Sequence, residues 1–145
     1  EYGKYSEDEA TWEHSQKRLE KKFQTAIQYV PKPVIQNEHG ADFGIIGFGS
    51  TDPAILEARD MLGGIGKPSN YCRIRAIPFT DEIKTFVEQN SRIYVVEINR
   101  DGQMCQLLQM TFPECAGRFI KICHSDGLPL SARWISESIQ STMEK

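Results

Sequence analysis

The sequence predicts an α/β fold in three layers (α/β/α), in which helices cover both faces of a mostly parallel, doubly wound sheet of four or five strands. From Ala41 onward, short apolar runs alternate with segments whose apolar residues recur at helical spacing. The chain has 145 residues, of which 39% are hydrophobic and 26% charged. It is therefore long enough for a single core and too apolar to be disordered.

Each of four expected strands is followed by a helix. The strands are expected at residues 42–48, 71–77, 92–98 and 118–123. The helices are expected at residues 53–62, in a short segment capped by Thr80 or Asp81, at residues 102–110, and in a last segment capped by Ser131. This strict alternation of strand and helix is typical of parallel sheets.

Residues 1–40 are expected to form an N-terminal helix and a linker, ahead of an α/β domain over residues 41–145. A helix is predicted over residues 6–30, where Ser6 and Glu9 form a capping box. Its apolar residues recur at roughly helical spacing and are Trp12, Leu19, Phe23, Ile27 and Val30. The linker that follows holds the apolar pair Val34-Ile35, which could form a short strand.

The strand order follows from the burial that each strand requires. Apolar residues nearly run together at residues 42–48 and 92–98, as in central strands, whereas charges interrupt the other two strands. Right-handed crossovers then favour the spatial order second, first, third, fourth. The loops at residues 47–51 and 97–103 consequently open side by side at the carboxyl end of the sheet, where α/β sheets usually bind ligands.

Eight residues of these two loops are candidates for a switch-point crevice or an interface: Gly47, Gly49, Ser50, Thr51, Glu97, Asn99, Gly102 and Gln103. A glycine-containing loop that opens a helix can cradle a phosphate. This loop, however, lacks the third glycine of the dinucleotide motif and the lysine of the Walker loop, and Asp52 would repel an anion. A tight strand-to-helix turn, or a surface that packs on another domain, is the competing interpretation.

Glu97 stands at the end of a central strand, where a carboxylate could act as an acid or base. No His, Cys or Lys is an obvious partner for it, so we expect it to bond backbone groups of the neighbouring glycine-rich loop. Asn99 is expected to cap the next helix. The sequence thus offers no catalytic residue, no cofactor-binding residue and no metal ligand set.

Charge and cysteine content exclude several functions. The net charge of −3 is unlike that of a nucleic-acid-binding protein, and no apolar run approaches the roughly 20 residues that span a membrane. The four cysteines show no C-x-x-C spacing, which argues against zinc or an iron–sulfur cluster. Buried, reduced thiols in a cytoplasmic protein are the expectation.

Several segments resemble the alpha subunit of 2-oxoacid:ferredoxin oxidoreductases, of the 2-oxoglutarate or pyruvate type, near its C-terminal end. They are Gly49-Ser50-Thr51, Glu57-Ala58, Pro78-Phe79, Glu97-x-Asn99-x-x-Gly102-Gln103, and the upstream Tyr5-Ser6-Glu7-Asp8 with the lysine-rich helix after it. The resemblance covers roughly residues 1–110. Phe48, in place of the more usual Trp, and the acidic Asp52 depart from the family pattern.

The resemblance implies a transketolase C-terminal-like domain, cut from a larger enzyme, with a structural and subunit-contact role. The whole enzyme would convert a 2-oxoacid to an acyl-CoA and reduce ferredoxin, with thiamine diphosphate, iron–sulfur clusters and coenzyme A. Those groups would be held by other domains and subunits of the same oxidoreductase. We therefore expect the chain alone to be inactive, with no nucleic-acid or membrane partner, and we expect Trp12, Phe48 and Trp134 to be candidates for a docking patch.

Two other functions remain open from the sequence. The first is a stand-alone flavodoxin-like module that binds a nucleotide in the crevice. The second is an acyl-transfer or hydrolase domain that uses Ser50, although no G-x-S-x-G elbow surrounds it.

Overall fold

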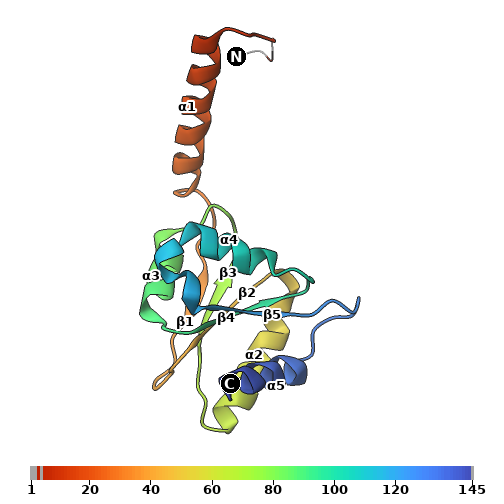
Figure 1. Ribbon diagram of the computed structural model, residues 1–145. Coiled ribbons are helices and arrows are strands. Elements are labelled where there is room, and N and C mark those ends of the chain that lie inside the picture. The colour runs from red at the N-terminus through yellow and green to blue at the C-terminus, as the bar shows by residue number, and fades with distance from the viewer. Residues whose placement is uncertain (1–2, 4, 145) are drawn as a thin grey trace.

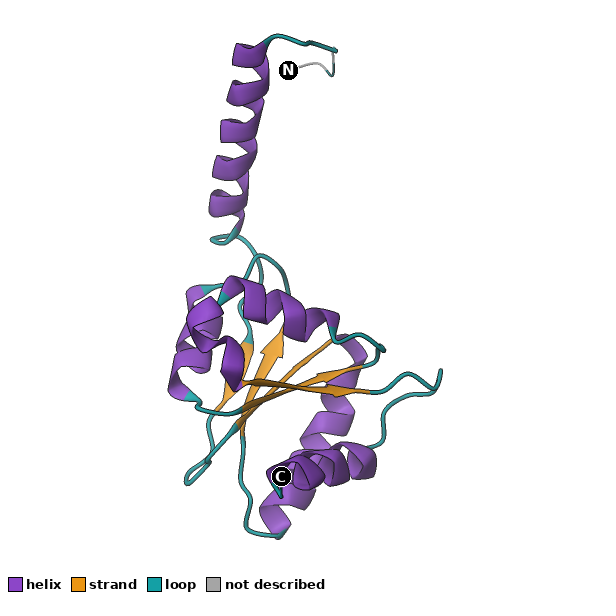
Figure 2. Cartoon of the chain, viewed as in Figure 1, coloured by secondary structure: helices purple, strands orange, loops and turns teal. Residues whose placement is uncertain are grey.

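The computed structural model describes residues 3 and 5–144, which form a five-stranded sheet between two layers of helices (Figures 1 and 2). The strands are β1 (Val34–Gln36), β2 (Gly44–Phe48), β3 (Asn70–Ile74), β4 (Ile93–Glu97) and β5 (Phe119–Cys123). Their order in the sheet is β1-β3-β2-β4-β5, and all neighbours are parallel except β1 and β3. The predicted fold class and the predicted order of the four parallel strands are both confirmed.

The described residues also form five α-helices and two 3-10 turns, with one helix before the first strand and one after the last. The helices are α1 (Glu9–Ala26), α2 (Asp52–Gly64), α3 (Asp81–Gln89), α4 (Gln103–Thr111) and α5 (Ala132–Met143), and the turns are η1 (Gly49–Thr51) and η2 (Pro113–Arg118). Helices α2 and α5 pack on one face of the sheet, and α3 and α4 on the other (Figure 1). Among the described residues, no helix combines the length and apolar character that crossing a bilayer requires.

Alternating side chains of the central strands divide between two cores. Ile45, Tyr94 and Val96 face α2 and α5, whereas Ile46 and Val95 face α3 and α4. Every residue of β4 is buried, because a parallel strand covered on both faces has no solvent side. The two cores make the sheet a rigid base for the loops at its carboxyl end.

Strand β1 pairs antiparallel with β3 at the edge of the sheet, with Val34 opposite Arg73. The short strand expected at Val34-Ile35 therefore exists. It belongs to the range assigned above to the helix and linker, so the sheet takes one strand from before residue 41. The division of the chain at residue 40 stays a prediction.

Helix α1 stands away from the rest of the molecule, and none of its residues is buried (Figure 1). Its N-cap is Asp8, whose side chain accepts from the backbone N–H of Thr11 at 2.8 Å. The capping box expected at Ser6 and Glu9 is therefore wrong, because the Ser6 hydroxyl accepts from Asp8 instead. The helix also ends at Ala26, four residues before the predicted end, since it has no core to extend it.

Candidate functional site

The loops after β2 and β4 lie side by side at the carboxyl end of the sheet and line one crevice with a volume of about 460 Å³. Its lining comes from Phe48, Gly49, Ser50, Thr51, Ile77, Glu97, Ile98, Asn99, Gln103, Met104 and Leu107. Six of the eight candidate residues thus line the crevice, and Gly47 and Gly102 do not. The sequence pointed to the polar loops but missed the apolar wall of Ile77, Met104 and Leu107, which comes from other positions in the chain.

The glycine-rich loop turns tightly from β2 into α2. The Thr51 hydroxyl donates to the backbone oxygen of Phe48 at 2.8 Å and accepts from the Phe48 N–H at 3.1 Å. Gly49 has a φ of +58°, a conformation that favours glycine. At Gly47 a Cβ would collide with the end of the Ile55 side chain. Gly49 is therefore needed for the conformation of this turn, and Gly47 for the packing of β2 against α2.

Asp52 occupies the first turn of α2, where an incoming anion would otherwise be favoured. The Tyr71 hydroxyl donates to its carboxylate at 2.7 Å, and Arg73 makes an ion pair with it at 3.1 Å. Burial and the hydrogen bond to Asp52 raise the pKa of Tyr71, so this phenol stays protonated. The start of α2 therefore already carries a negative charge that two side chains hold in place. The sequence identified Asp52 but not its partners on β3.

Glu97 is fully buried, and its carboxylate closes the start of α4. One oxygen accepts from the backbone N–H of Cys105 at 2.9 Å, and the other accepts from Met104 N–H at 2.8 Å and from the Asn99 side-chain amide at 2.6 Å. The sequence correctly predicted that Glu97 bonds backbone groups. It named the wrong partner, because these groups belong to the helix that follows Glu97 and not to the glycine-rich loop.

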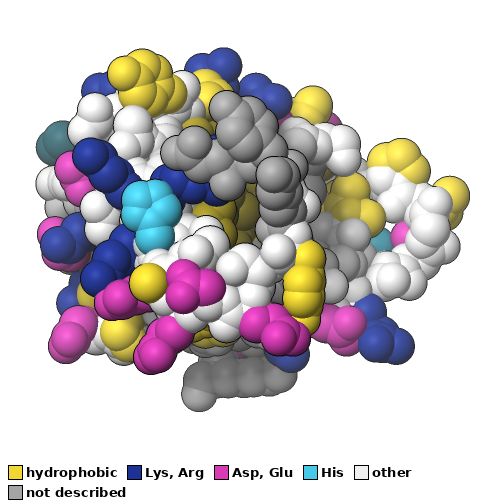
Figure 3. Space-filling view, turned by 90° about the horizontal axis from the view of Figure 1, so that it is seen from above, with side chains coloured by type: hydrophobic (Ala, Val, Ile, Leu, Met, Phe, Trp, Pro, Cys, Tyr) yellow, Lys and Arg dark blue, Asp and Glu magenta, His cyan; other side chains and the backbone are white. Residues whose placement is uncertain are grey.

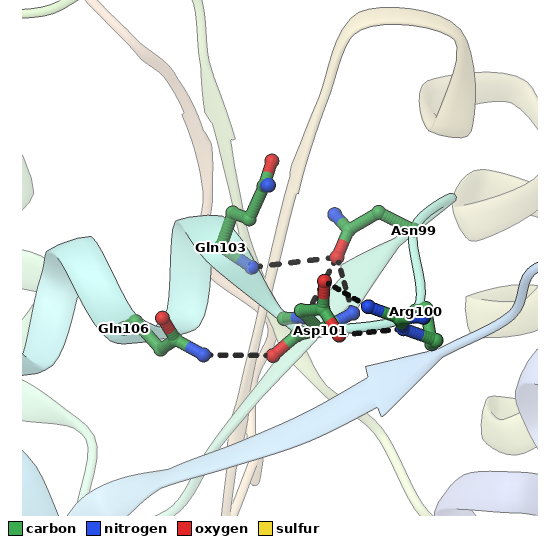
Figure 4. A network of polar contacts seen from close by, with 6 residues as sticks. Asn99, Arg100, Asp101, Gln103 and Gln106 are labelled. Carbon is green, nitrogen blue, oxygen red and sulfur yellow. Dashed lines mark hydrogen bonds and ion pairs between the residues drawn. The ribbon is translucent and has the colours of Figure 1, made fainter.

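Asn99 shapes the turn between β4 and α4, as Figure 4 shows. Its side-chain oxygen accepts from the backbone N–H of Gly102 at 2.6 Å and from Asp101 and Gln103 at 3.1 and 3.4 Å. Gly102 has a φ of +73°, and a Cβ there would press on Cys123 and Lys121. The N-cap of α4 is Gly102, so the expectation that Asn99 caps this helix is wrong in position: its side chain bonds the N–H groups of the turn that leads into the helix. Gly102 is needed for conformation and space.

The remaining chemistry of the crevice is limited. Both helix starts that face it carry an internal carboxylate, and no base among the described residues is hydrogen-bonded to Ser50. Burial raises the pKa of Cys105 to about 11, which keeps this thiol neutral and unreactive. Among residues 3 and 5–144, no group of three or more His, Cys, Asp or Glu side chains is placed to hold a metal ion. What the crevice offers is an apolar wall with a few polar groups.

Fold and crevice together define a doubly wound α/β domain in which the two helix starts at the switch point carry carboxylates of the chain itself. A split-gene transketolase, solved as an inactive tetramer, shares this fold with a TM-score of 0.64 and 17% identity, over 78% of this chain and 42% of that one. No known family profile matches the chain.

The particular similarity is to 2-oxoacid:ferredoxin oxidoreductases. The chain is 28% identical over 150 aligned residues to subunit alpha of 2-oxoacid:ferredoxin oxidoreductase 2 from Aeropyrum pernix, and the match covers 99% of this chain and 23% of that subunit. The structure of the 2-oxoglutarate:ferredoxin oxidoreductase from Magnetococcus marinus, with 2-oxoglutarate, coenzyme A and succinyl-CoA bound, matches 96% of this chain and 24% of its own, with a TM-score of 0.77 and 21% identity. The resemblance expected from the motifs is thus confirmed.

The chain spans about a quarter of the length of these two relatives. In contrast, the alpha chain of a probable 2-oxoacid ferredoxin oxidoreductase from Thermoplasma acidophilum is matched over 98% of its own length and 79% of this chain, with a TM-score of 0.51 and 24% identity. Nearly all of that chain therefore consists of this fold.

Proposed function

We propose that the chain is the C-terminal structural and subunit-contact domain of a 2-oxoacid:ferredoxin oxidoreductase alpha subunit. The observation that carries this proposal is the similarity over 99% of the chain to such a subunit. The whole enzyme would oxidatively decarboxylate a 2-oxoacid to an acyl-CoA and pass the electrons to ferredoxin in the cytoplasm. Residues 41–145 would be the docking body, and residues 1–40 would connect it to the rest of the enzyme.

The internal carboxylates argue that the cofactors bind elsewhere. Thiamine diphosphate and coenzyme A both present phosphates, and a phosphate at the switch point would meet the charges of Asp52 and Glu97. Iron–sulfur clusters require converging thiolates. Cys72 and Cys115 are buried in the core, and burial raises the pKa of Cys72 to about 12. Among the described residues, the switch point and these buried cysteines therefore fit none of the three groups, which supports binding of the cofactors elsewhere in the enzyme.

Helix α1 supports the contact role. Trp12 and Phe23 are each 64% exposed, and Leu19 lies between them on the same side of the helix at 38% exposure. Large apolar side chains on a helix without core contacts are typical of a surface that another domain or subunit covers. Of the three docking candidates, Trp12 is exposed, whereas Phe48 and Trp134 are partly buried against the two cores.

Charge on the α1 side of the molecule is mixed. Seen from that end, basic, acidic and hydrophobic side chains are all present on the part of the face that is coloured in Figure 3. Nucleic-acid binding relies on a patch of predominantly positive charge. This face therefore suits a protein partner better than nucleic acid.

The test uses the complete oxidoreductase, in which the alpha subunit that contains this domain is co-expressed with its partner subunits. We expect the double substitution Trp12→Ala and Phe23→Ala to reduce co-purification of those subunits and, with it, ferredoxin reduction by pyruvate or 2-oxoglutarate with coenzyme A. Met110→Ala is the matched control, because Met110 is a 76% exposed apolar residue on α4. Normal assembly and activity of the double variant would contradict the contact role. Turnover by the 145-residue chain alone would contradict the proposal as a whole.

Calorimetry separates this proposal from the flavodoxin-like alternative. We expect FMN, ADP and coenzyme A to show no saturable binding to the chain in the micromolar range, because both helix starts are occupied by carboxylates. Saturable binding of one of them that is lost when Gly49 is substituted would favour the nucleotide-binding module instead.

A further inference from the structure

The loop between β5 and α5 projects from the body at the carboxyl end of the sheet, where it forms the extended blue loop of Figure 1. It carries Leu128, which is 65% exposed. Gly127 beside it has a φ of +83°, which places a sharp turn at the tip. A projecting loop with so little buried surface needs polar contacts to keep one conformation.

Two hydrogen bonds of Asp126 fold the tip of this loop back towards the sheet. One carboxylate oxygen accepts from the backbone N–H of Leu128 at 2.9 Å, and the other lies 2.9 Å from Nε2 of His124. The backbone N–H of His124 donates to the carbonyl of Glu97 at 3.1 Å, which anchors His124 to the end of β4. Asp126 thus links the tip of the loop, through His124, to the end of β4.

The imidazole of His124 also packs against Trp134 in the first turn of α5. The two ring centroids are 4.5 Å apart and the planes are tilted by 37°. The backbone of Trp134 is held in turn by the N-cap Ser131, whose hydroxyl oxygen accepts from the Trp134 N–H at 3.2 Å. His124 therefore lies between an aromatic face and a carboxylate, and a positive charge on the imidazole strengthens both contacts.

We propose that His124, Asp126 and Trp134 form a proton-dependent latch that fixes the β5–α5 loop when His124 is protonated and loosens it when His124 is neutral. The sign follows from the contacts: both are stronger when the imidazole carries a positive charge, so the loop is held more firmly at low pH than at high pH. This inference does not depend on the proposed function.

Charged groups on the surrounding elements are balanced. They are Glu97 on β4, Arg100 and Asp101 in the next turn, Lys121 on β5, and Arg133 and Glu137 on α5. Of the acidic groups among the described residues, Asp126 is the one within 4 Å of the imidazole. Asp126 is therefore the charged group that acts most strongly on the His124 imidazole.

The test measures the hydrogen-exchange protection factor of the Leu128 amide in the 145-residue chain at about pH 5.5 and about pH 8, values that bracket ordinary histidine titration. We expect protection in the wild-type chain to fall about fivefold to tenfold at the higher pH, the combined effect of an exposed ion pair and a cation–π contact. Asp126→Asn is the matched variant, because its side-chain oxygen still accepts from Leu128 while the charge is gone.

We expect Asp126→Asn to lose at least half of this pH response, on a logarithmic scale, and His124→Gln to lose all of it. Amide dispersion in NMR spectra is the check that both variants remain folded, which we expect because both substituted residues are partly exposed. Equal protection at both pH values in the wild-type chain would overturn the proposal. An undiminished pH response in His124→Gln would also overturn it.

Discussion

Asn99 and Glu97 divide the free backbone donors at the start of α4 between them, and they bond to each other at 2.6 Å. Asn99 takes the N–H groups of the turn, up to Gln103, and Glu97 takes those of Met104 and Cys105. A helix start normally leaves four such donors without partners. In a doubly wound sheet, such N–H donors usually bind an anion from outside. Here the side chains of Asn99 and Glu97 accept these hydrogen bonds instead.

Replacing the Glu97 carboxylate should destabilise the fold strongly. In Glu97→Gln, the side-chain NH₂ would face a backbone N–H donor, and the charge that balances the helix start is lost. We expect the free energy of unfolding, measured in urea, to fall by about 2–3 kcal/mol. Asp101→Asn, at an exposed position of the same turn, is the control and should change it by less than about 0.5 kcal/mol. Equal effects of the two substitutions would show that the buried carboxylate has no special role.

Gly47 should not tolerate a side chain. In Gly47→Ala, the new methyl group would collide with Ile55 and approach Thr51 Oγ1 at 3.0 Å. We expect a loss of about 1–3 kcal/mol in unfolding free energy, as for overpacked cores. Gly63→Ala is the matched control within α2, because a Cβ there meets nothing within 4 Å, and it should be neutral or stabilising. A neutral Gly47→Ala would mean that α2 can shift away from β2.

The buried thiol of Cys72 should make stability depend on alkaline pH. Burial raises the pKa of Cys72 from about 9 in the unfolded chain to about 12. A raised pKa favours the neutral thiol, so its contribution is complete below pH 9 and is lost as the pH rises from 9 towards 12. In urea unfolding at several pH values, the free energy of unfolding should fall less steeply with rising pH in Cys72→Ala than in the wild type.

Cys123→Ala is the control for this experiment. Cys123 is only partly buried, so Cys123→Ala should reduce the pH dependence of the unfolding free energy less than Cys72→Ala does. If both variants follow the wild-type curve, the alkaline loss comes from other groups, with Tyr71 and Cys105 the next to test.

Helix α1 should be dispensable for the stability of the body. A chain that begins at Pro31 lacks α1 but keeps β1, and none of the α1 residues is buried. We expect its unfolding free energy to lie within about 0.5 kcal/mol of the full chain, with the same cooperativity. A truncation that begins at Ala41 also removes β1 and should cost more. A large loss in the first truncation would show that α1 contacts the body in solution.

Much of the fold was predictable because its signals are local. The runs at Ile45-Ile46 and Val95-Val96 mark β2 and β4 as central strands by themselves, and Arg73 and Lys121 mark β3 and β5 as the strands that flank this pair. The right-handed crossover rule then leaves few possible orders. The adjacency of the two loops in the crevice follows from that order, which explains why six candidate residues line it.

The errors concern partners that only folding brings together. Nothing near Asp52 in sequence reveals that Tyr71 and Arg73 reach it from the neighbouring strand. Glu97 bonds the start of α4, and not the glycine-rich loop, because the start of α4 points at its carboxylate. The sequence alone does not show this direction. The cap of α1 was misplaced because Ser6 and Asp8 both suit an N-cap, and local sequence does not rank them.

Strand β1 joins α1 to the sheet, and it is three exposed residues long and held along one side by β3. A mechanical load that arrives through α1 therefore reaches this edge before any other part of the sheet. The buried parallel strands β2 and β4 would feel it only after β1 has peeled away from β3. Detachment of the edge strand β1 would therefore protect the buried core from a force applied to α1.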